Sequence, residues 1–172
     1  MNADANLTGS LLVAHPSLRD PNFRRTIVFV SQHSQEDGAM GFVLNRPIDT
    51  EVNELADVPV FYGGPVDVGQ MLLTSLQWRE NPDMVAFRAF VAPVDEDSMP
   101  GWTHGLRVFA GYSGWTPGQL ESEVAENTWI VIPPTREWIE MKNPESAWRK
   151  VMHATSPLLH LLSEEPDDPG LN

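Results

Sequence analysis

A chain of 172 residues with 41% hydrophobic and 20% charged residues has the length and balance of one globular domain. Its net charge of −13 disfavours direct nucleic-acid binding and docking on anionic membranes, since both need a positive surface. The absence of cysteine excludes disulfides, thiolate catalysis and cysteine–zinc sites. Because no membrane-spanning apolar run and no signal peptide is recognisable, we expect a cytoplasmic protein.

Short β-branched or apolar segments, separated by turn-forming residues, predict strands through the first two-thirds of the chain. The segments 26–31 and 40–44 predict an antiparallel hairpin whose turn lies at 35–38. A short helical turn is expected at 51–55, and an exposed loop at 95–101. Further strands are predicted at residues 10–14, 60–62, 71–76, 85–91, 106–110 and 128–132.

Residues 111–123, with the sequence GYSGWTPGQLESE, predict a glycine-rich turn that runs directly into a helix at 117–126. Thr116 is expected to cap this helix, with Pro117 in its first position. Gln119, three residues after the cap, would complete a capping box. More residues have a specific predicted local role in this junction than in any other segment of the chain.

Helical patterns dominate the last third of the chain. A helix capped by Thr135 is expected to extend to Met141, and one that starts at Asn143 and Pro144 to run to about His153. A last helical turn is predicted at 158–162. Strands followed by helices, without strict alternation, indicate an α+β fold in a single domain of residues 1–163. Residues 164–172 are expected to form a flexible acidic tail.

The sequence offers no recognisable catalytic constellation, which makes an enzyme the less favoured interpretation. Ser113 lies in a Gly-Tyr-Ser-Gly segment, which misses the nucleophile-elbow pattern by one position. The five histidines lack metal-ligand spacing, so we expect no metal and no cofactor. Glu121, Glu123 and Glu126 are explained by the dipole at a helix start, with paired catalytic acids as the weaker alternative.

Six residues form the candidate surface for a ligand or a partner. Arg46 has a restricted direction between its neighbours, although a structural ion pair would explain it equally. The two glycine turns could present N–H groups to an anion, or could simply be tight turns. The aromatic side chains could stack on a ligand or pack in the core. The candidates are Asn45, Arg46, Gly63, Gly64, Tyr112 and Trp115.

Several linked motifs carry a family resemblance. They occupy residues 9–16, 20–23, 41–47, 61–66 and 111–123. In this order they resemble the YqgE/AlgH family of bacterial proteins, over roughly residues 9–132 and more loosely to about residue 162. The resemblance implies a cytoplasmic bacterial protein whose mainly antiparallel sheet is barrel-like or bifurcated and flanked by helices. The family carries the label of transcriptional regulators, and it supplies no catalytic residues to transfer.

Two functions of different classes follow. The leading hypothesis is a non-enzymatic regulatory or protein-interaction domain that affects transcription through protein partners, since the acidic charge opposes direct DNA contact. The alternative is a protein that binds a small anion or metabolite, which includes an enzyme without recognisable motifs. Direct DNA binding ranks third, and the sequence predicts no oligomeric state.

Overall fold

The computed structural model describes residues 5–49, 58–91 and 96–164. The predicted helical turn at 51–55 lies outside the described residues. The strands are β1 (Leu11–Ala14), β2 (Ile27–Ser34), β3 (Gly38–Val43), β4 (Pro47–Ile48), β5 (Val60–Tyr62), β6 (Val66–Arg79), β7 (Met84–Phe90), β8 (Leu106–Trp115) and β9 (Trp129–Ile132). The strands range from 2 residues in β4 to 14 residues in β6.

The helices follow the strands along the chain, apart from α1, which precedes the last strand. A 3₁₀ turn at Glu96–Ser98 lies in the loop expected at 95–101. Thr135 caps the second helix, because its hydroxyl accepts from the N–H of Trp138 at 3.4 Å. The predicted tail lies outside the described residues, apart from Glu164. The helices are α1 (Gln119–Ala125), α2 (Arg136–Ile139), α3 (Pro144–Thr155) and α4 (Pro157–Ser163).

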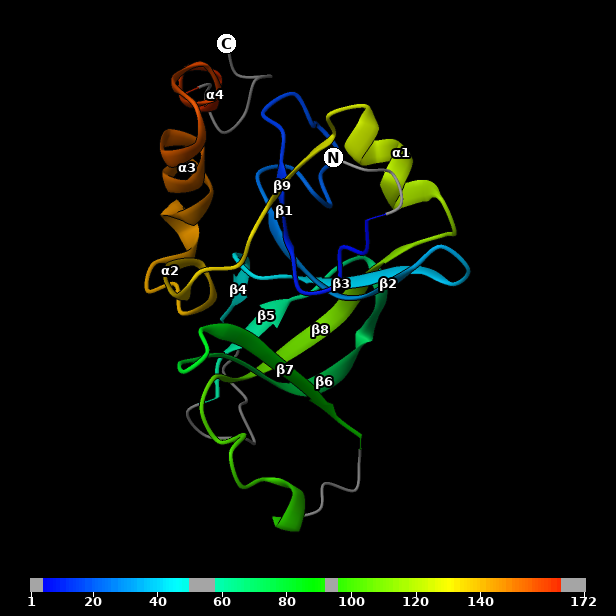
Figure 1. The fold of residues 1–172 in the computed structure, drawn as a ribbon, viewed down its shortest axis with the longest axis vertical. Helices are drawn as coiled ribbons and strands as arrows, with labels where there is room; N and C mark the ends of the chain where they lie inside the picture. The colour runs from blue at the N-terminus through cyan, green and yellow to red at the C-terminus, as the bar shows by residue number, and fades with distance from the viewer. Residues whose placement is uncertain (1–4, 50–57, 92–95, 165–172) are drawn as a thin grey trace.

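The sheet is curled and forks at β8 (Figure 1). Its main path runs β4-β5-β8-β3-β2-β1-β9, and β6 and β7 branch from β8. Every pairing among the described strands is antiparallel except β5–β8, which is parallel. The predicted α+β fold with a mainly antiparallel, bifurcated or barrel-like sheet is confirmed as a half-barrel.

Both faces of the central strand β1 are buried, because successive side chains point to opposite faces of a sheet. Leu11 and Val13 contribute to a core shared with α2 and α3, whereas Leu12 and Ala14 face the core beneath α1. Figure 1 accordingly shows α1 apart from the column of α2, α3 and α4. Trp148 of α3 donates its Nε1–H to the carbonyl of Ala14 at 2.8 Å, which anchors the column to the sheet.

Aromatic rings fill the space between the branch and the main sheet. Phe42 of β3 stacks on Phe109 of β8 at 4.6 Å between ring centroids. Phe87 of β7 lies 5.3 Å from Phe29 and 5.6 Å from Phe42, so β7 packs over β2 and β3. The burial of several large rings in one cluster is the main stabilisation that holds the branch against the sheet.

The predicted glycine turn at 111–115 is wrong, because β8 continues through these residues to Trp115. Tyr112 pairs with Val66 of β6, and Trp115 pairs with Ala39 of β3. Gly111 has φ of 73°, which lets the strand bend where it passes from one branch to the other. Long-range pairing therefore overrides the local turn signal of the glycines.

The turn lies instead at residues 116–119. The N–H of Gln119 donates to the carbonyl of Thr116 at 3.0 Å, and Gly118 adopts φ of 82° and ψ of −14°, which suits the third position of a type II turn. Helix α1 begins at Gln119 with Gly118 as its cap, so the predicted hydroxyl cap at Thr116 is wrong. The other half of the capping box forms, since Gln119 Oε1 accepts from the N–H of Thr116 at 3.0 Å.

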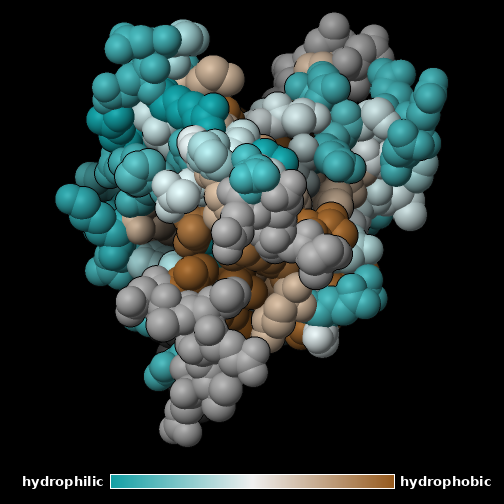
Figure 2. Space-filling model, turned by 90° about the horizontal axis from the view of Figure 1, so that it is seen from below, coloured by the Kyte–Doolittle hydropathy of each residue, from teal (hydrophilic) through white to brown (hydrophobic). Residues whose placement is uncertain are grey.

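Exposed apolar side chains gather in two places. One group lies on the β6–β7 branch and just after it: Val68, Met71, Met84 and Val91. The other lies on α4: Leu158, Leu161 and Leu162. Figure 2 views the molecule from below and shows apolar residues in the middle of that face, with hydrophilic residues around them. In the part of the chain that the structure describes, none of the helices has the length and apolar character needed to cross a bilayer.

Candidate functional site

Asn45 holds the segment that leads into β2. Its side chain is buried; Oδ1 accepts from the N–H of Ile27 at 2.9 Å, and Nδ2 donates to the carbonyl of Arg25 at 2.9 Å. Buried backbone groups need such partners, and Asn45 supplies one of each kind. The oxygen and the nitrogen of the Asn45 amide therefore both form hydrogen bonds within the fold.

Arg46 fixes the same segment through two backbone carbonyls. Its Nη1 donates to Asn22 O and its Nη2 to Arg24 O, each at 2.8 Å. The guanidinium lies over the ring of Tyr62, 5.8 Å from the centroid. Burial lowers the pKa of Arg46, and burial raises the pKa of the Tyr62 hydroxyl, because a low-dielectric site favours the neutral form of each. We call Asn45, Arg46 and Tyr62, together with the loop they hold, the Arg46 clamp.

Gly63 and Gly64 let the chain after β5 cross β8 in direct backbone contact. A Cβ on Gly63 would lie 2.3 Å from the carbonyl oxygen of Gly111, and one on Gly64 would lie 2.2 Å from that of Tyr112. The N–H of Gly63 donates to the carbonyl of Ala110 at 2.9 Å and is therefore already used. This pair of glycines and Tyr112 meet as a packing contact between two strands.

Trp115 lies in the core on the α1 side of the sheet. Its Nε1–H donates to Glu123 Oε1 at 3.1 Å, and the Nε1–H of Trp129 donates to the same oxygen at 3.0 Å. The other oxygen of Glu123 accepts from Gln119 Nε2 at 2.9 Å. Phe23 packs against both indoles, with centroids 6.3 and 5.6 Å away. Glu123 thus anchors α1 to two tryptophans, a role that its position near a helix start did not indicate.

The six predicted residues therefore fall into three neighbourhoods. Asn45 and Arg46 belong to the clamp, the two glycines meet Tyr112 at the strand crossing, and Trp115 lies under α1 with Glu123. Each has a structural partner in this arrangement. Their use as a ligand or partner surface stays a prediction.

His33 and Glu121 form a polar pair beside α1. Nδ1 of His33 accepts from the N–H of Leu7 at 2.9 Å, which places the ring proton on Nε2. Nε2 then donates to the carboxylate of Glu121. The pair ties the N-terminal segment and β2 to α1.

The remaining chemical candidates from the sequence have structural surroundings. Ser113 is fully buried and donates its hydroxyl to the carbonyl of Gly63 at 3.0 Å. Across residues 5–49, 58–91 and 96–164, no three His, Asp or Glu side chains gather into a group able to hold a metal ion.

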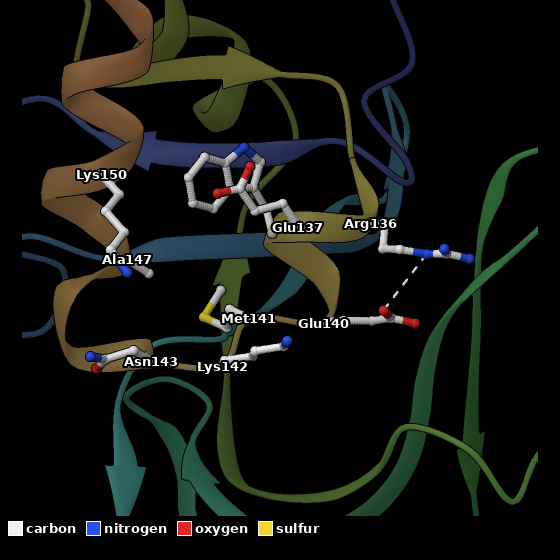
Figure 3. A pocket seen from close by; sticks show the side chains of 9 residues that line it. Arg136, Glu137, Glu140, Met141, Lys142, Asn143, Ala147 and Lys150 are labelled. Atoms are coloured by element: carbon white, nitrogen blue, oxygen red, sulfur yellow. Dashed lines mark ion pairs between the residues drawn. The ribbon is translucent and has the colours of Figure 1, made fainter.

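Two hollows flank α2, and each has a volume of about 410 Å³. The first lies between α2 and the start of α3 (Figure 3). Nε of Arg136 lies 3.7 Å from Oε2 of Glu140, and Arg136 also pairs with Glu80. Lys142 and Lys150 line the same hollow, and neither has an ion-pair partner among the described residues. Glu137 and Glu140 also line this hollow, so its charge is mixed, with three basic and two acidic side chains.

The second hollow opens between β5, β6 and β8 and shares Glu140 and Met141 with the first. Its walls include Phe61, Trp78 and Arg107. Arg107 is 9% exposed, and it is the functional candidate that sequence reasoning missed. The signal was present, since Arg107 is the single charged residue in the otherwise apolar strand predicted at 106–110.

A forked half-barrel with α1 on one side and α2–α4 on the other defines a single-domain α+β protein, with two adjoining hollows beside α2. The AlgH-like family model matches residues 11–159 of this chain. The chain therefore belongs to the YqgE/AlgH family, and the resemblance of its motifs is confirmed.

Relatives in actinobacteria match over nearly the whole chain. The UPF0301 protein of Streptomyces avermitilis is 36% identical over 193 residues, which cover 100% of this chain and 98% of that protein. The UPF0301 protein of Mycobacteroides abscessus is 38% identical over 183 residues, with 95% and 87% covered.

Two solved structures share the fold. A crystal structure of a Corynebacterium diphtheriae protein matches with a TM-score of 0.76 at 23% identity and covers 96% of this chain and 95% of its own. The solution structure of AlgH from Pseudomonas aeruginosa matches with a TM-score of 0.61 at 22% identity and covers 98% of both chains. At these identities the likeness establishes the fold.

Proposed function

We propose that this chain is a non-enzymatic, cytoplasmic regulatory domain that acts by binding a protein partner through α4. The single observation behind the proposal is the leucine face of α4. Leu158, Leu161 and Leu162 are 66%, 69% and 41% exposed. Their spacing of three and four residues places them on one side of the helix. Large exposed apolar faces of this kind mark interaction sites.

The opposite side of α4 is firmly docked, so the leucine face is presented on a fixed helix. Leu159 packs against the core, and Ser163 is fully buried. Nε of Arg149 donates to the carbonyl of Ser163 at 3.3 Å. The rings of His153 and His160 meet edge to face at 4.6 Å between centroids. A rigid helix loses little conformational entropy on binding, which favours recognition in a groove.

Charge selects the kind of partner. The chain carries a net charge of −13, and Glu164 lies directly after α4. Two copies would repel one another, whereas a partner with a Lys- or Arg-rimmed apolar groove would be attracted and oriented. We therefore assign α4 a partner of that chemistry. Any effect on transcription would pass through this partner and would need no contact between the domain and DNA.

The test is direct binding between purified proteins. A photo-reactive residue at position 161 identifies the cellular partner, which is then purified and titrated against the full chain. Leu161→Glu should weaken the affinity about tenfold or more, because it removes an apolar anchor and introduces a charge in the contact. Affinity should also fall as salt rises, since the rim contacts are charged.

Met71→Glu is the matched control, because Met71 is 61% exposed on β6 and gives an apolar-to-acidic change elsewhere. It should leave the affinity unchanged. A partner whose binding is indifferent to Leu161→Glu would refute the role of α4. A dimer of the purified chain that Leu161→Glu dissociates would show that a second copy covers the face instead.

A further inference from the structure

Arg107 is a buried arginine without a matching carboxylate. It lies on β8 opposite Thr74 of β6 and is 9% exposed. Its Nη2 donates to the carbonyl of Ile139 at 3.2 Å, and its guanidinium lies 5.6 Å from the ring centroid of Phe61. In the described part of the chain, no carboxylate lies within ion-pair distance of this side chain. A positive charge is thus held in a recess with one carbonyl and one aromatic face.

Burial lowers the pKa of Arg107 from its usual value to about 10. The side chain therefore remains charged at neutral pH. Buried charges without partners are unfavourable, and the usual solutions are a paired carboxylate or an apolar replacement. Position 107 keeps the charge, and no described carboxylate pairs with it, so the contacts within the described residues do not explain why an arginine stands there.

The unpaired N–H groups of Arg107 are open to the hollow. A guanidinium has five N–H donors in a planar fork, and the carbonyl of Ile139 uses one side of it. Among the described residues, Nδ1 of His160 is the one polar side-chain atom that is both buried from solvent and without a hydrogen-bond partner. No nitrogen of Arg107 is in that state. The free nitrogens of Arg107 are consequently not sealed in the core. They face the hollow of about 410 Å³ that the side chain lines.

The walls of the hollow would accommodate an apolar group of a ligand next to the Arg107 guanidinium. Phe61 and Trp78 contribute aromatic surface, and Met141 lies at the border with the neighbouring hollow. Glu140 shares that border; its Oε2 lies 3.7 Å from Nε of Arg136, which also pairs with Glu80. A volume of this size accommodates a small organic molecule, and a few fixed polar groups in apolar walls are typical of ligand sites.

We propose that this hollow binds a small organic anion, whose carboxylate or phosphate is held by the Arg107 fork and whose apolar or aromatic body lies against Phe61, Trp78 and Met141. Carboxylates and phosphates both match the fork, because each can accept two parallel N–H bonds. In the adjoining hollow, Lys142 and Lys150 balance the charges of Glu137 and Glu140, so Arg107 itself supplies the positive charge of the site. The site is distinct from the α4 surface, so either proposal can fail without the other.

The test is an NMR titration of the full chain with benzoate, phenyl phosphate and inorganic phosphate. Saturable shifts of the Arg107 Nε–H and the Trp78 indole N–H are expected with at least one of the two aromatic anions. Saturation by benzoate identifies a carboxylate site, and saturation by phenyl phosphate identifies a phosphate site. Inorganic phosphate should bind more weakly, because it has no apolar body to bury.

Arg107→Met should weaken the binding at least about tenfold, since it removes a charge-assisted pair of hydrogen bonds. Arg107→Lys keeps the charge but loses the fork, and it should weaken binding by a similar factor even if the methionine variant folds poorly. Arg88→Met is the matched control. Arg88 also has one carbonyl partner, Ser98 O at 3.1 Å, and it lies near aromatic rings, 5.3 Å from the centroid of Phe90 and 5.9 Å from that of Trp102. Its replacement should leave binding unchanged.

Three results would overturn the proposal. The first is the absence of saturable shifts with all three anions at millimolar concentration. The second is unchanged affinity in both Arg107 variants. The third, equal affinity for phenyl phosphate and inorganic phosphate, would remove the role given to the aromatic walls.

Discussion

Arg46 and Arg107 lie against adjacent residues of the same short strand, and their surroundings differ. The guanidinium of Arg46 lies over the ring of Tyr62 and donates hydrogen bonds to two backbone carbonyls. Arg107 covers Phe61 and donates to a single carbonyl. Because neighbouring residues of a strand point to opposite faces, the two arginines occupy opposite sides of β5. Burial lowers the pKa of both.

The difference separates a structural arginine from one available to a ligand. Arg46 closes a loop and donates from both of its terminal nitrogens to backbone carbonyls of that loop. Arg107 keeps donors that open onto a hollow, and the proposed anion would use them. Sequence reasoning selected Arg46 and passed over Arg107, although the second makes the better candidate for binding. Four measurements can break or sharpen this contrast.

The largest effect is expected where β5 crosses β8, since both arginines depend on that crossing. In Gly64→Ala the new Cβ would lie 2.2 Å from backbone atoms of Tyr112, at a φ of 155°. We expect a loss of about 4 kcal/mol or failure to fold, because backbone atoms cannot move aside cheaply. Urea denaturation measures it. Gly69→Ala, whose Cβ would meet nothing within 4 Å, is the control and should change stability little.

Arg46→Met should destabilise the chain by about 2 kcal/mol, because two carbonyls lose charge-assisted hydrogen bonds. Arg136→Met is a suitable control, since the Arg136 side chain is 52% exposed and its removal should cost under about 0.5 kcal/mol. Thermal and urea unfolding of the two variants give the comparison. Equal stability of Arg46→Met and the unmodified chain would mean that the clamp contributes nothing to folding.

Arg107→Met should change stability in the opposite direction, with a gain of about 1 kcal/mol. Burial lowers the pKa of Arg107 to about 10, which corresponds to a burial penalty of about 3 kcal/mol at neutral pH. The lost contacts with Ile139 and Phe61 offset about 1 kcal/mol each. A clear destabilisation in urea denaturation would place Arg107 with Arg46 as a structural residue.

The smallest expected effect is the pH dependence of the stability gained in the Arg107→Met variant. Above about pH 10 the folded chain loses the Arg107 proton while the unfolded chain keeps it, so the stability contributed at position 107 rises with pH there. The penalty is fully present below about pH 10. The advantage of Arg107→Met should therefore be constant from pH 7 to 9 and decline by about 1 kcal/mol near pH 11. A constant difference up to pH 11 would contradict an uncompensated Arg107 charge.

Local patterns in the sequence account for most of the fold. The β-branched run at 26–31 and the apolar run at 60–62 become strands because their burial and propensity agree. The Pro144 helix start and the Thr135 cap also follow local chemistry. The glycine-rich segment at 111–115 could not be assigned in this way. Its strand conformation comes from pairing with β3 and β6, which no neighbouring residue encodes.

The candidate site was harder to predict, because its defining property is a relation in space. The chain has 24 acidic residues, and the sequence does not tell whether one of them reaches Arg107. The structural role of Glu123 was hidden for the same reason, since its partners Trp115 and Trp129 come together only in the folded sheet. Residue types were visible in both cases, whereas their contacts were not.

The place of β1 in the sheet also sets an order on biosynthesis. One edge of β1 pairs with β2, which follows soon after it, but the other edge pairs with β9, where Leu11 lies opposite Ile132. A ribosome must therefore translate most of the chain before the second edge can be covered. Until then β1 exposes unpaired N–H and C=O groups on a strongly apolar strand, a state that is prone to aggregation. A nascent chain halted before β9 should consequently bind chaperones preferentially. A nascent chain whose β9 has already emerged from the ribosome should not.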